Sequence, residues 1–185
     1  MSQKILLSEK KVSIILHRLS CQLIERHLDF TNTVMVGIQP RGIYLLERLV
    51  ALLKEKKPSI SLQTGKLDTT FFRDDFRRSE KPLAANSTEM HLSIEGKSVV
   101  LIDDVLFTGR SIRAALTAID SYGRPKAIEL LVLVDRRFSR HLPIQPDYLG
   151  AQIDALQGDR VKVVWSDKGK GDIVYLEEKE TENEV

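Results

Sequence analysis

The stretch VVLIDDVLFTGRS, residues 99–111, decides the fold class of this chain. Its four leading apolar residues predict a strand that runs into the core, and two carboxylates, Asp103 and Asp104, follow where that strand leaves it. Neighbouring side chains of a strand point to opposite faces, so both carboxylates cannot simply face solvent. Residues 108–111 then open a helix, whose free N–H groups, dipole and hydroxyls form an anion cradle. Paired carboxylates suit a diol and the cradle suits a phosphate, so the stretch favours a ribose phosphate ligand.

The same stretch also has simpler interpretations. Taken alone, an Asp-Asp pair usually begins an ordinary loop, and Thr108 or Ser111 could merely cap a helix. The stretch has no Gly-Lys-Ser/Thr ending, which excludes a Walker loop, and the dinucleotide fingerprint is absent. Gly109 lets the backbone approach a phosphate closely. Because apolar strand, paired acids and Thr-Gly-x-Ser coincide in this order, a binding site is the favoured interpretation.

Outside this stretch, strand-like apolar segments alternate with amphipathic helices. Such alternation predicts an α/β fold with a doubly wound, mainly parallel sheet, because parallel strands need crossover connections. Ligands of these sheets bind at the carboxyl ends of strands, here the loops at 37–42, 103–111 and 135–141. The expected helices cover residues 9–29 (capped by Ser8), 43–56 and 111–122; the expected strands cover 33–38, 60–63 and 67–72 (turned at Gly65), 98–102, 127–134, 161–165 and 172–176, with an irregular segment at 135–155.

Composition narrows the class of protein. The chain has 185 residues and a net charge of +2, which excludes a general DNA-coating protein. One domain is expected over 1–176, followed by an acidic tail at 177–185. No apolar run approaches the ~20 residues of a membrane span, and the first residues resemble no secretory signal, so a cytoplasmic protein without membrane contact is expected. A single cysteine, Cys21, excludes an internal disulfide and a Cys-based zinc site.

The stretch at 99–111 resembles the phosphoribosyl pyrophosphate signature of type I phosphoribosyltransferases. Other segments are similar to the pyrimidine operon regulator/uracil phosphoribosyltransferase family (PyrR). GIQPRGIYL at 37–45 resembles its pyrophosphate loop, TFFRDD at 70–75 resembles the entry to its flexible catalytic loop, and LVDR at 133–136 continues the match. The similarity runs from about residue 6 to residue 175, nearly the whole chain.

The resemblance implies a type I phosphoribosyltransferase fold with a small hood at about 135–160 and a mobile catalytic loop at about 73–94. It implies transfer of the 5-phosphoribosyl group from phosphoribosyl pyrophosphate to uracil, giving UMP and pyrophosphate, with Mg²⁺ as the cofactor. Asp103 and Asp104 would hold the ribose hydroxyls and help place the metal, and Arg73 would assist catalysis. Phosphoribosyl pyrophosphate would contact Arg41, Gly42, Val105, Leu106, Phe107, Thr108, Gly109, Arg110 and Ser111, and the base would contact Val134, Asp135, Arg136 and Phe138.

The resemblance also implies partners and leaves alternatives open. Uridine nucleotides are possible effectors, and a homodimer or higher homo-oligomer is expected. An RNA-binding, uridine-nucleotide-sensing attenuation regulator of pyrimidine genes remains an alternative, as does a purine-base salvage phosphoribosyltransferase. Basic residues at 136–141 could serve RNA, but Cys21 stands where the family has His, and a thiol is a poor hydrogen-bond former. His27 and His91 are interpreted as ordinary surface histidines.

The chain departs from the family pattern in two further loops. Residues 39–41 read Gln-Pro-Arg where the family usually has Lys-Thr-Arg, and Pro40 removes one N–H from the anion site. The loop at 135–143 is longer and bulkier than the Gly-containing family version. Since this loop selects the base, it decides between uracil and a purine.

Overall fold

The computed structural model describes residues 3–73, 87–90, 92–155, 158–166 and 171–177. Among these residues, no helix is long and apolar enough to cross a membrane. The elements are β1 (Gln3–Leu7), α1 (Glu9–His27), β2 (Thr33–Ile38), α2 (Gly42–Lys56), β3 (Gln63–Leu67), η1 (Thr70–Phe72), β4 (Ser98–Leu106), α3 (Arg110–Ile119), η2 (Asp120–Tyr122), β5 (Ala127–Arg137), β6 (Tyr148–Asp154), β7 (Arg160–Val164) and β8 (Ile173–Glu177).

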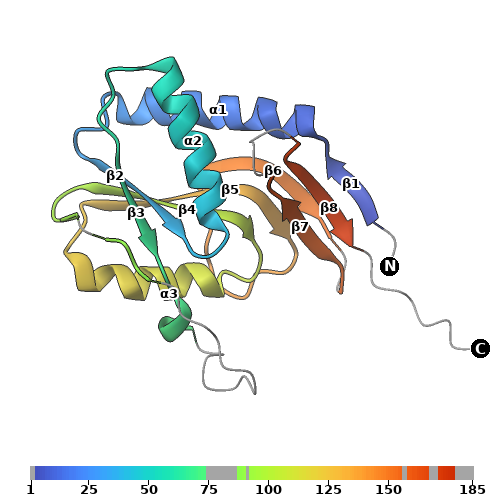
Figure 1. The fold of residues 1–185 in the computed structure, drawn as a ribbon. Helices are drawn as coiled ribbons and strands as arrows, with labels where there is room; N and C mark the ends of the chain where they lie inside the picture. Colours follow the sequence, from blue (N-terminus) through green and yellow to red (C-terminus); the bar gives the residue numbers. More distant parts are fainter. Residues whose placement is uncertain (1–2, 74–86, 91, 156–157, 167–170, 178–185) are drawn as a thin grey trace, which may run out of the picture.

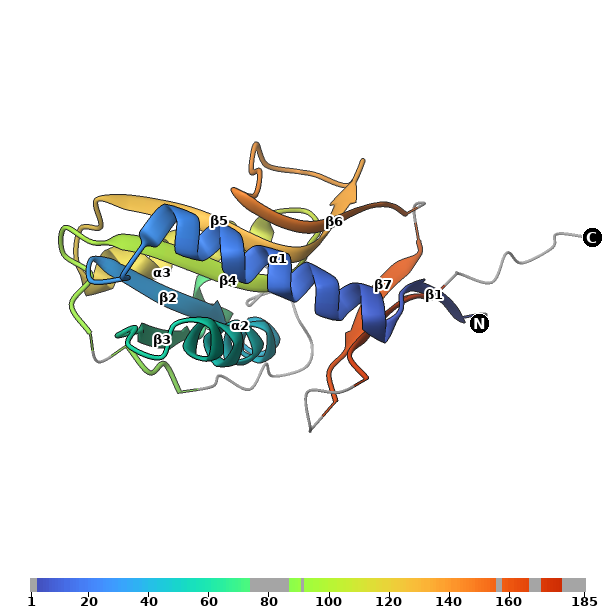
Figure 2. The ribbon, with the colours of Figure 1, turned by 90° about the horizontal axis from the view of Figure 1, so that it is seen from above.

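Five strands form a parallel sheet in the order β3-β2-β4-β5-β6, which confirms the doubly wound α/β architecture. Helices α1 and α2 cover one face of this sheet and α3 covers the other (Figure 1). A second, antiparallel sheet of β1, β8 and β7 lies beside the main one (Figure 2). The small sheet joins the beginning of the described chain to its end.

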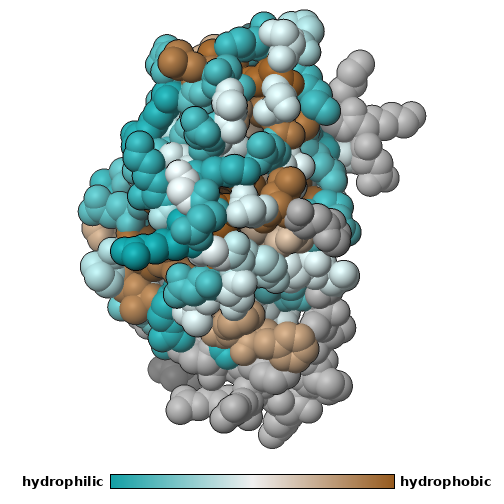
Figure 3. All heavy atoms as spheres, turned by 90° about the vertical axis from the view of Figure 1, so that its left-hand side faces the viewer, coloured by the Kyte–Doolittle hydropathy of each residue, from teal (hydrophilic) through white to brown (hydrophobic). Residues whose placement is uncertain are grey.

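Side chains of a strand alternate between its two faces, so the core residues of β4 pack on opposite sides of the main sheet. Val100 and Ile102 pack toward α1 and α2, whereas Val99 and Leu101 pack toward α3. All six residues of β2 are buried, as its continuous apolar sequence predicts for a strand covered on both faces. The face at the left of Figure 1 presents mainly hydrophilic side chains, interrupted by separate apolar patches (Figure 3).

The expected hairpin at Gly65 is wrong. Residues 63–67 form one strand that pairs in parallel with β2, and the strand runs straight through Gly65. A Cβ on this glycine would lie 2.4 Å from the sulfur of Met90, so the residue leaves room for a packed side chain rather than making a turn. The expected second strand is a short 3₁₀ turn at 70–72.

The interpretation of residues 135–155 as irregular is also wrong. β5 continues to Arg137, and β6 pairs with it in parallel over Tyr148–Asp154. The segment expected to form the hood, about 135–160, contains the end of β5, all of β6 and Arg160, the first residue of β7, and the bounds of the hood stay a prediction. The small sheet is built from β1, β8 and β7, and in it β1 pairs with a strand far away in sequence.

Smaller boundary differences concern the helices and β4. Ser8 precedes α1, but its side chain makes no capping hydrogen bond. β4 extends to Leu106, so Asp103 and Asp104 lie within the strand, not in a loop after it. Most of the expected catalytic loop, residues 74–86 and 91, and the tail beyond Glu177 lie outside the described residues, so the expectations for those segments and for the domain limits stay predictions.

The sequence predicted a surface histidine at position 27, and this prediction is wrong. The side chain of His27 is buried and only 5% exposed. Its Nε2 lies 3.1 Å from the Glu129 carboxylate and 3.0 Å from the Tyr148 hydroxyl, and its Nδ1 lies 2.9 Å from Thr33 Oγ1. The Tyr148 hydroxyl also donates to Glu129, as does Arg26. Burial lowers the pKa of His27, while Glu129 opposes that shift. This network ties the end of α1 to the sheet. His91 lies outside the described residues.

Candidate active site

The two carboxylates of β4 have different environments. Asp104 is buried, and its Oδ2 accepts a hydrogen bond from Arg41 Nε at 2.7 Å. Arg41 also donates to the main-chain carbonyl of Val163 in β7. Asp103 instead lines a cavity with the loop that follows β4, and its Oδ1 accepts the N–H of Asp104 at 2.9 Å. The main sheet therefore presents one carboxylate to an open cavity and neutralises the other with Arg41.

The pKa of Asp103 is strongly raised. Burial and the neighbouring Asp104 charge raise the pKa of Asp103 to about 8, against the opposing effects of the Asp104 N–H and Arg41. The folded protein therefore holds a proton on Asp103 at pH values where the unfolded chain has lost it. A cationic group arriving in the cavity would favour the ionised form.

We expect the raised pKa to make the stability of the ligand-free protein depend on pH. Because folding favours protonated Asp103, its contribution to the free energy of unfolding is greatest near pH 4 and is lost as the pH rises to about 8. Asp103→Asn has no such proton. Its thermal midpoint should therefore exceed that of the wild type by more at pH 8 than at pH 5, a difference worth at least ~1 kcal/mol or about 2–4 °C. Scanning calorimetry with divalent cations chelated measures this gap; a gap that is constant from pH 5 to pH 8 contradicts the raised pKa.

The loop after β4 forms the wall of a cavity of about 240 Å³. Gly109 adopts a φ of 90°, a left-handed conformation that glycine reaches without strain, and α3 begins directly after it. Because Asp103 and the first turn of α3 lie on one cavity, the anion cradle and a carboxylate meet as the sequence predicts. The cavity is lined by Arg73, Asp103, Val105, Leu106, Phe107, Thr108, Gly109, Arg110, Ser111 and Ile112.

Gly42, expected at the phosphate, has a packing role in the structure. A Cβ on this residue would lie 2.2 Å from the main-chain oxygen of Ile102, so only glycine allows the start of α2 to approach β4 this closely. Neither Gly42 nor Arg41 lines the cavity beside Asp103. Arg41 contacts the Asp104 carboxylate, and its expected contact with phosphoribosyl pyrophosphate stays a prediction.

The residues expected to contact the base lie at the end of β5. Val134, Asp135 and Arg136 are buried, whereas Phe138 is 84% exposed. The Arg136 guanidinium lies 4.1 Å from the centre of the Phe107 ring, and its Nε has no hydrogen-bond partner within the described part of the chain. Arg136, Phe107 and Phe138 line a second cavity of about 580 Å³. Phe107 thus borders both cavities, which places the residues expected to contact the base next to the loop expected to bind phosphate.

Asp135 is already bound by residues that the sequence did not single out for this role. The Arg140 guanidinium contacts one carboxylate oxygen, and Gln152 Nε2 lies 3.4 Å from the other. Arg140 stood out only as one of several cations in the 136–141 loop, and no local pattern indicated its partner. Asp135 is therefore paired within the chain and is not a free carboxylate.

The cationic cluster expected to serve RNA is largely paired within the chain. Arg137 forms a two-point ion pair with Asp154 at 2.5 Å, and Arg140 pairs with Asp135. Arg18 of α1 donates to two main-chain carbonyls of β6. Each of these guanidiniums keeps N–H donors that these contacts do not use, but the carboxylates of Asp154 and Asp135 already offset the positive charges of Arg137 and Arg140.

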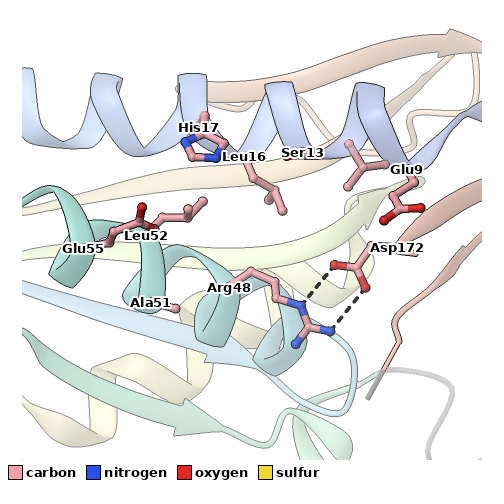
Figure 4. Close-up of a pocket in the computed structure, with 10 residues that line it drawn as sticks. Glu9, Ser13, Leu16, His17, Arg48, Ala51, Leu52, Glu55 and Asp172 are labelled. Carbon is pink, nitrogen blue, oxygen red and sulfur yellow. Dashed lines mark hydrogen bonds and ion pairs between the residues drawn. The ribbon is translucent and has the colours of Figure 1, made fainter. Parts of the chain in front are cut away.

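A third cavity, of about 480 Å³, lies between α1 and α2, away from these residues (Figure 4). Arg48 and Asp172 close one end of it with an ion pair, in which Nε lies 3.0 Å from Oδ2. None of the residues predicted for the site lines this cavity.

Comparison with known proteins fits this geometry. The phosphoribosyl transferase domain matches residues 2–165. The bifunctional protein PyrR of Enterococcus faecalis is 42% identical over 161 residues, covering 87% of this chain and 89% of that protein. The chain belongs to the PyrR family of type I phosphoribosyltransferases. Another family member, the bifunctional protein PyrR of Synechocystis, is 40% identical over 171 residues, covering 92% of this chain and 94% of its own length.

Solved structures agree with the family at the level of the fold. A hypoxanthine phosphoribosyltransferase from Staphylococcus aureus superposes with a TM-score of 0.64 at 22% identity, covering 82% of this chain and 78% of the other. The type I phosphoribosyltransferase fold is thereby confirmed, and with the matching domain it makes the chain a glycosyltransferase. Identity this low carries no information on which base is used.

Proposed function

We propose that this protein transfers the 5-phosphoribosyl group of phosphoribosyl pyrophosphate to uracil, forming UMP and releasing pyrophosphate. The observation that carries the proposal is the shared cavity of Asp103 and the loop 107–111, bordered through Phe107 by the cavity that contains Arg136. A ribose phosphate bound along the loop would place its hydroxyls near Asp103 and its first carbon toward the second cavity.

In this reaction the bond from the sugar's first carbon to pyrophosphate breaks, and a uracil nitrogen bonds to the same carbon. The proton that this nitrogen loses would pass to the departing pyrophosphate. The N–H groups at the start of α3, with Thr108 and Ser111, would hold the 5-phosphate. Asp103 would bind the hydroxyls and stabilise the positive charge that develops on the sugar. Arg73, beside the cavity, would face the departing pyrophosphate, because a guanidinium matches phosphate oxygens.

The donor chemistry of the site fits Mg²⁺. This cation prefers oxygen ligands and usually binds one or two carboxylates together with substrate phosphates. Asp103 would hold it, with Asp104 close behind in the same strand, and the ion would neutralise charge on the pyrophosphate. Arg41, which binds Asp104, keeps the charge of that second carboxylate balanced.

Arg136 supports a base that carries a carbonyl oxygen at the position where cytosine carries its amino group. Within the described residues its buried Nε–H has no acceptor, and a carbonyl can accept that hydrogen where the amino group cannot. With phosphoribosyl pyrophosphate and Mg²⁺, we expect uracil to give a kcat/KM at least about tenfold above cytosine, ~1.4 kcal/mol in the transition state. Pyrophosphate release over a panel of free bases measures this ratio. Arg136→Met should reduce it, whereas Arg137→Met, a change at the exposed neighbour, should not. Faster turnover of hypoxanthine or guanine than of uracil would instead support purine salvage.

A second candidate function is RNA-binding attenuation of pyrimidine genes, with uridine nucleotides as effectors in the same cavity. The name of these relatives, bifunctional protein PyrR, favours it. Assembly into a homodimer or larger homo-oligomer would accompany either function. The internal pairing of Arg137 and Arg140 argues for weak RNA binding by a single copy.

A gel-shift titration tests the second candidate. We expect weak binding with little preference for one hairpin, because Asp154 and Asp135 already offset the charges of Arg137 and Arg140 that would attract a phosphate. Binding should fall with salt at a log–log slope of roughly 0.7 for each phosphate neutralised on a single strand. Tight binding to one pyrimidine-leader hairpin, stimulated by uridine nucleotides and absent for a scrambled hairpin, would make regulation the main role.

A further inference from the structure

Two residues of the loop after β5, Arg140 and His141, hydrogen-bond the loop at 107–111, which we call the phosphate loop. They do so from outside the cavity that this loop shares with Asp103. Arg140 donates to the main-chain oxygen of Phe107 at 2.5 Å, and the N–H of His141 donates to the main-chain oxygen of Thr108 at 3.0 Å. The Arg140 stem also packs on the loop: a Cβ at Gly109 would lie 3.7 Å from its Cδ. These contacts link successive residues of the phosphate loop to one short segment that is distant in sequence.

The same guanidinium is anchored at its other side. Arg140 contacts the carboxylate of Asp135, whose side chain is only 8% exposed, while that of Arg140 is 22% exposed. A planar guanidinium presents its donors in a rigid fork, so two acceptors held at once determine its orientation. Because both partners are largely shielded from water, the ion pair is only weakly screened. Arg140 is therefore a two-point tether between Asp135 at the base side and the backbone of the phosphate loop.

We propose that Arg140 is a positioning residue, which holds the phosphate loop in its binding shape and couples that loop to Asp135. The inference rests on the proposed function, since it assumes that the loop binds a ribose phosphate. Arg140 does not line the phosphate cavity, so it acts through the main chain of Phe107 rather than by touching the phosphate, while the neighbouring N–H of His141 holds Thr108.

Contacts that hold the phosphate loop in its binding shape before the ligand arrives should strengthen binding. Each loop residue that is left free must be ordered when the ligand binds, at a cost of about 1–2 kcal/mol in backbone entropy. The ring of Phe107 is 44% exposed and is contacted by Arg136, while Gly109 adds freedom of its own, so a contact to the main chain orders the loop further. A change at Asp135 moves the anchor of the tether, so a base that contacts Asp135 would alter affinity for the sugar phosphate, and the reverse.

Binding of ribose 5-phosphate, a ligand without a base, isolates this effect. Calorimetric titration would compare the wild type with Arg140→Met, Asp135→Asn and the double variant. We expect Arg140→Met to weaken binding about tenfold, equivalent to 1.4 kcal/mol, and Asp135→Asn to weaken it about threefold although its side chain lies outside the phosphate cavity. The double variant should bind no more weakly than Arg140→Met, because both changes break one tether. Arg137→Met, at an exposed ion pair with Asp154, is the matched control and should bind like the wild type.

Several results would overturn the inference. Unchanged affinity in Arg140→Met with an intact thermal midpoint shows that the contacts are only structural. If Arg140→Met does not fold, the affinity of Asp135→Asn is the test. Wild-type affinity in Asp135→Asn would likewise show that the contacts are only structural. If the fold-losses of affinity in the two single variants multiply in the double variant, Arg140 and Asp135 act independently. Failure of the proposed function appears elsewhere, as absent turnover of uracil by a wild-type protein that still binds ribose 5-phosphate.

Discussion

Replacing Asp103 and Asp104 together by Asn should lower turnover of phosphoribosyl pyrophosphate and uracil by at least about 100-fold, ~2.7 kcal/mol in the transition state. Each single change should cost at least about tenfold. Asp103 lines the cavity and would meet the sugar directly, whereas Asp104 acts through its ion pair with Arg41. An amide keeps the shape of the carboxylate but loses the charge that opposes the developing positive charge on the sugar.

Pyrophosphate release under saturating substrates measures the loss, with the thermal midpoint of each variant as a check on folding. Asp120→Asn is the matched control, because this exposed carboxylate lies at the far end of α3. Wild-type turnover in the double variant would show that the cavity beside β4 is not the active site. A loss in Asp104→Asn that exceeds the loss in Asp103→Asn would give the buried ion pair the larger role.

Glu129→Ala should lower the free energy of unfolding by about 3–5 kcal/mol, the largest effect on stability that we expect from a single change. Glu129 is the shared acceptor of Arg26, His27 and Tyr148, so its removal leaves buried donors unpaired. Burial and the same carboxylate raise the pKa of Tyr148, which keeps its hydroxyl protonated as a donor.

Urea unfolding monitored by circular dichroism measures this loss. Asp154→Ala is the control, because its ion pair with Arg137 is about half exposed on both sides and such pairs contribute less than about 1 kcal/mol. Equal losses of unfolding free energy in Glu129→Ala and Asp154→Ala would mean that the buried network around Glu129 stabilises the protein no more than an exposed ion pair does. Turnover should change little in Glu129→Ala protein that is still folded, since Glu129 lines neither cavity at the carboxyl ends of the strands.

The sequence by itself determined the features that depend on near neighbours. The apolar run before Asp103 and the helix start after Gly109 predicted β4, its loop and α3 in order, and the structure places Asp103 on one cavity with that loop. Alternating strands and helices predicted the parallel sheet. Periodicity and capping act over a few residues, so the order of residues along the chain is enough to show them.

Only the tertiary structure decided the features that join distant segments. β1 pairs with β8 across nearly the whole chain, and β6 exists as a strand because β5 lies beside it. His27 is buried because Glu129, 102 residues away, supplies its partner. Arg41 could not be assigned to Asp104, nor Arg140 to Phe107, by any local pattern, since a cation in a loop has the same sequence signal whether it meets solvent or a carboxylate. Which charges are paired depends on how the layers pack, and that packing determines which groups of this site are free to meet a ligand.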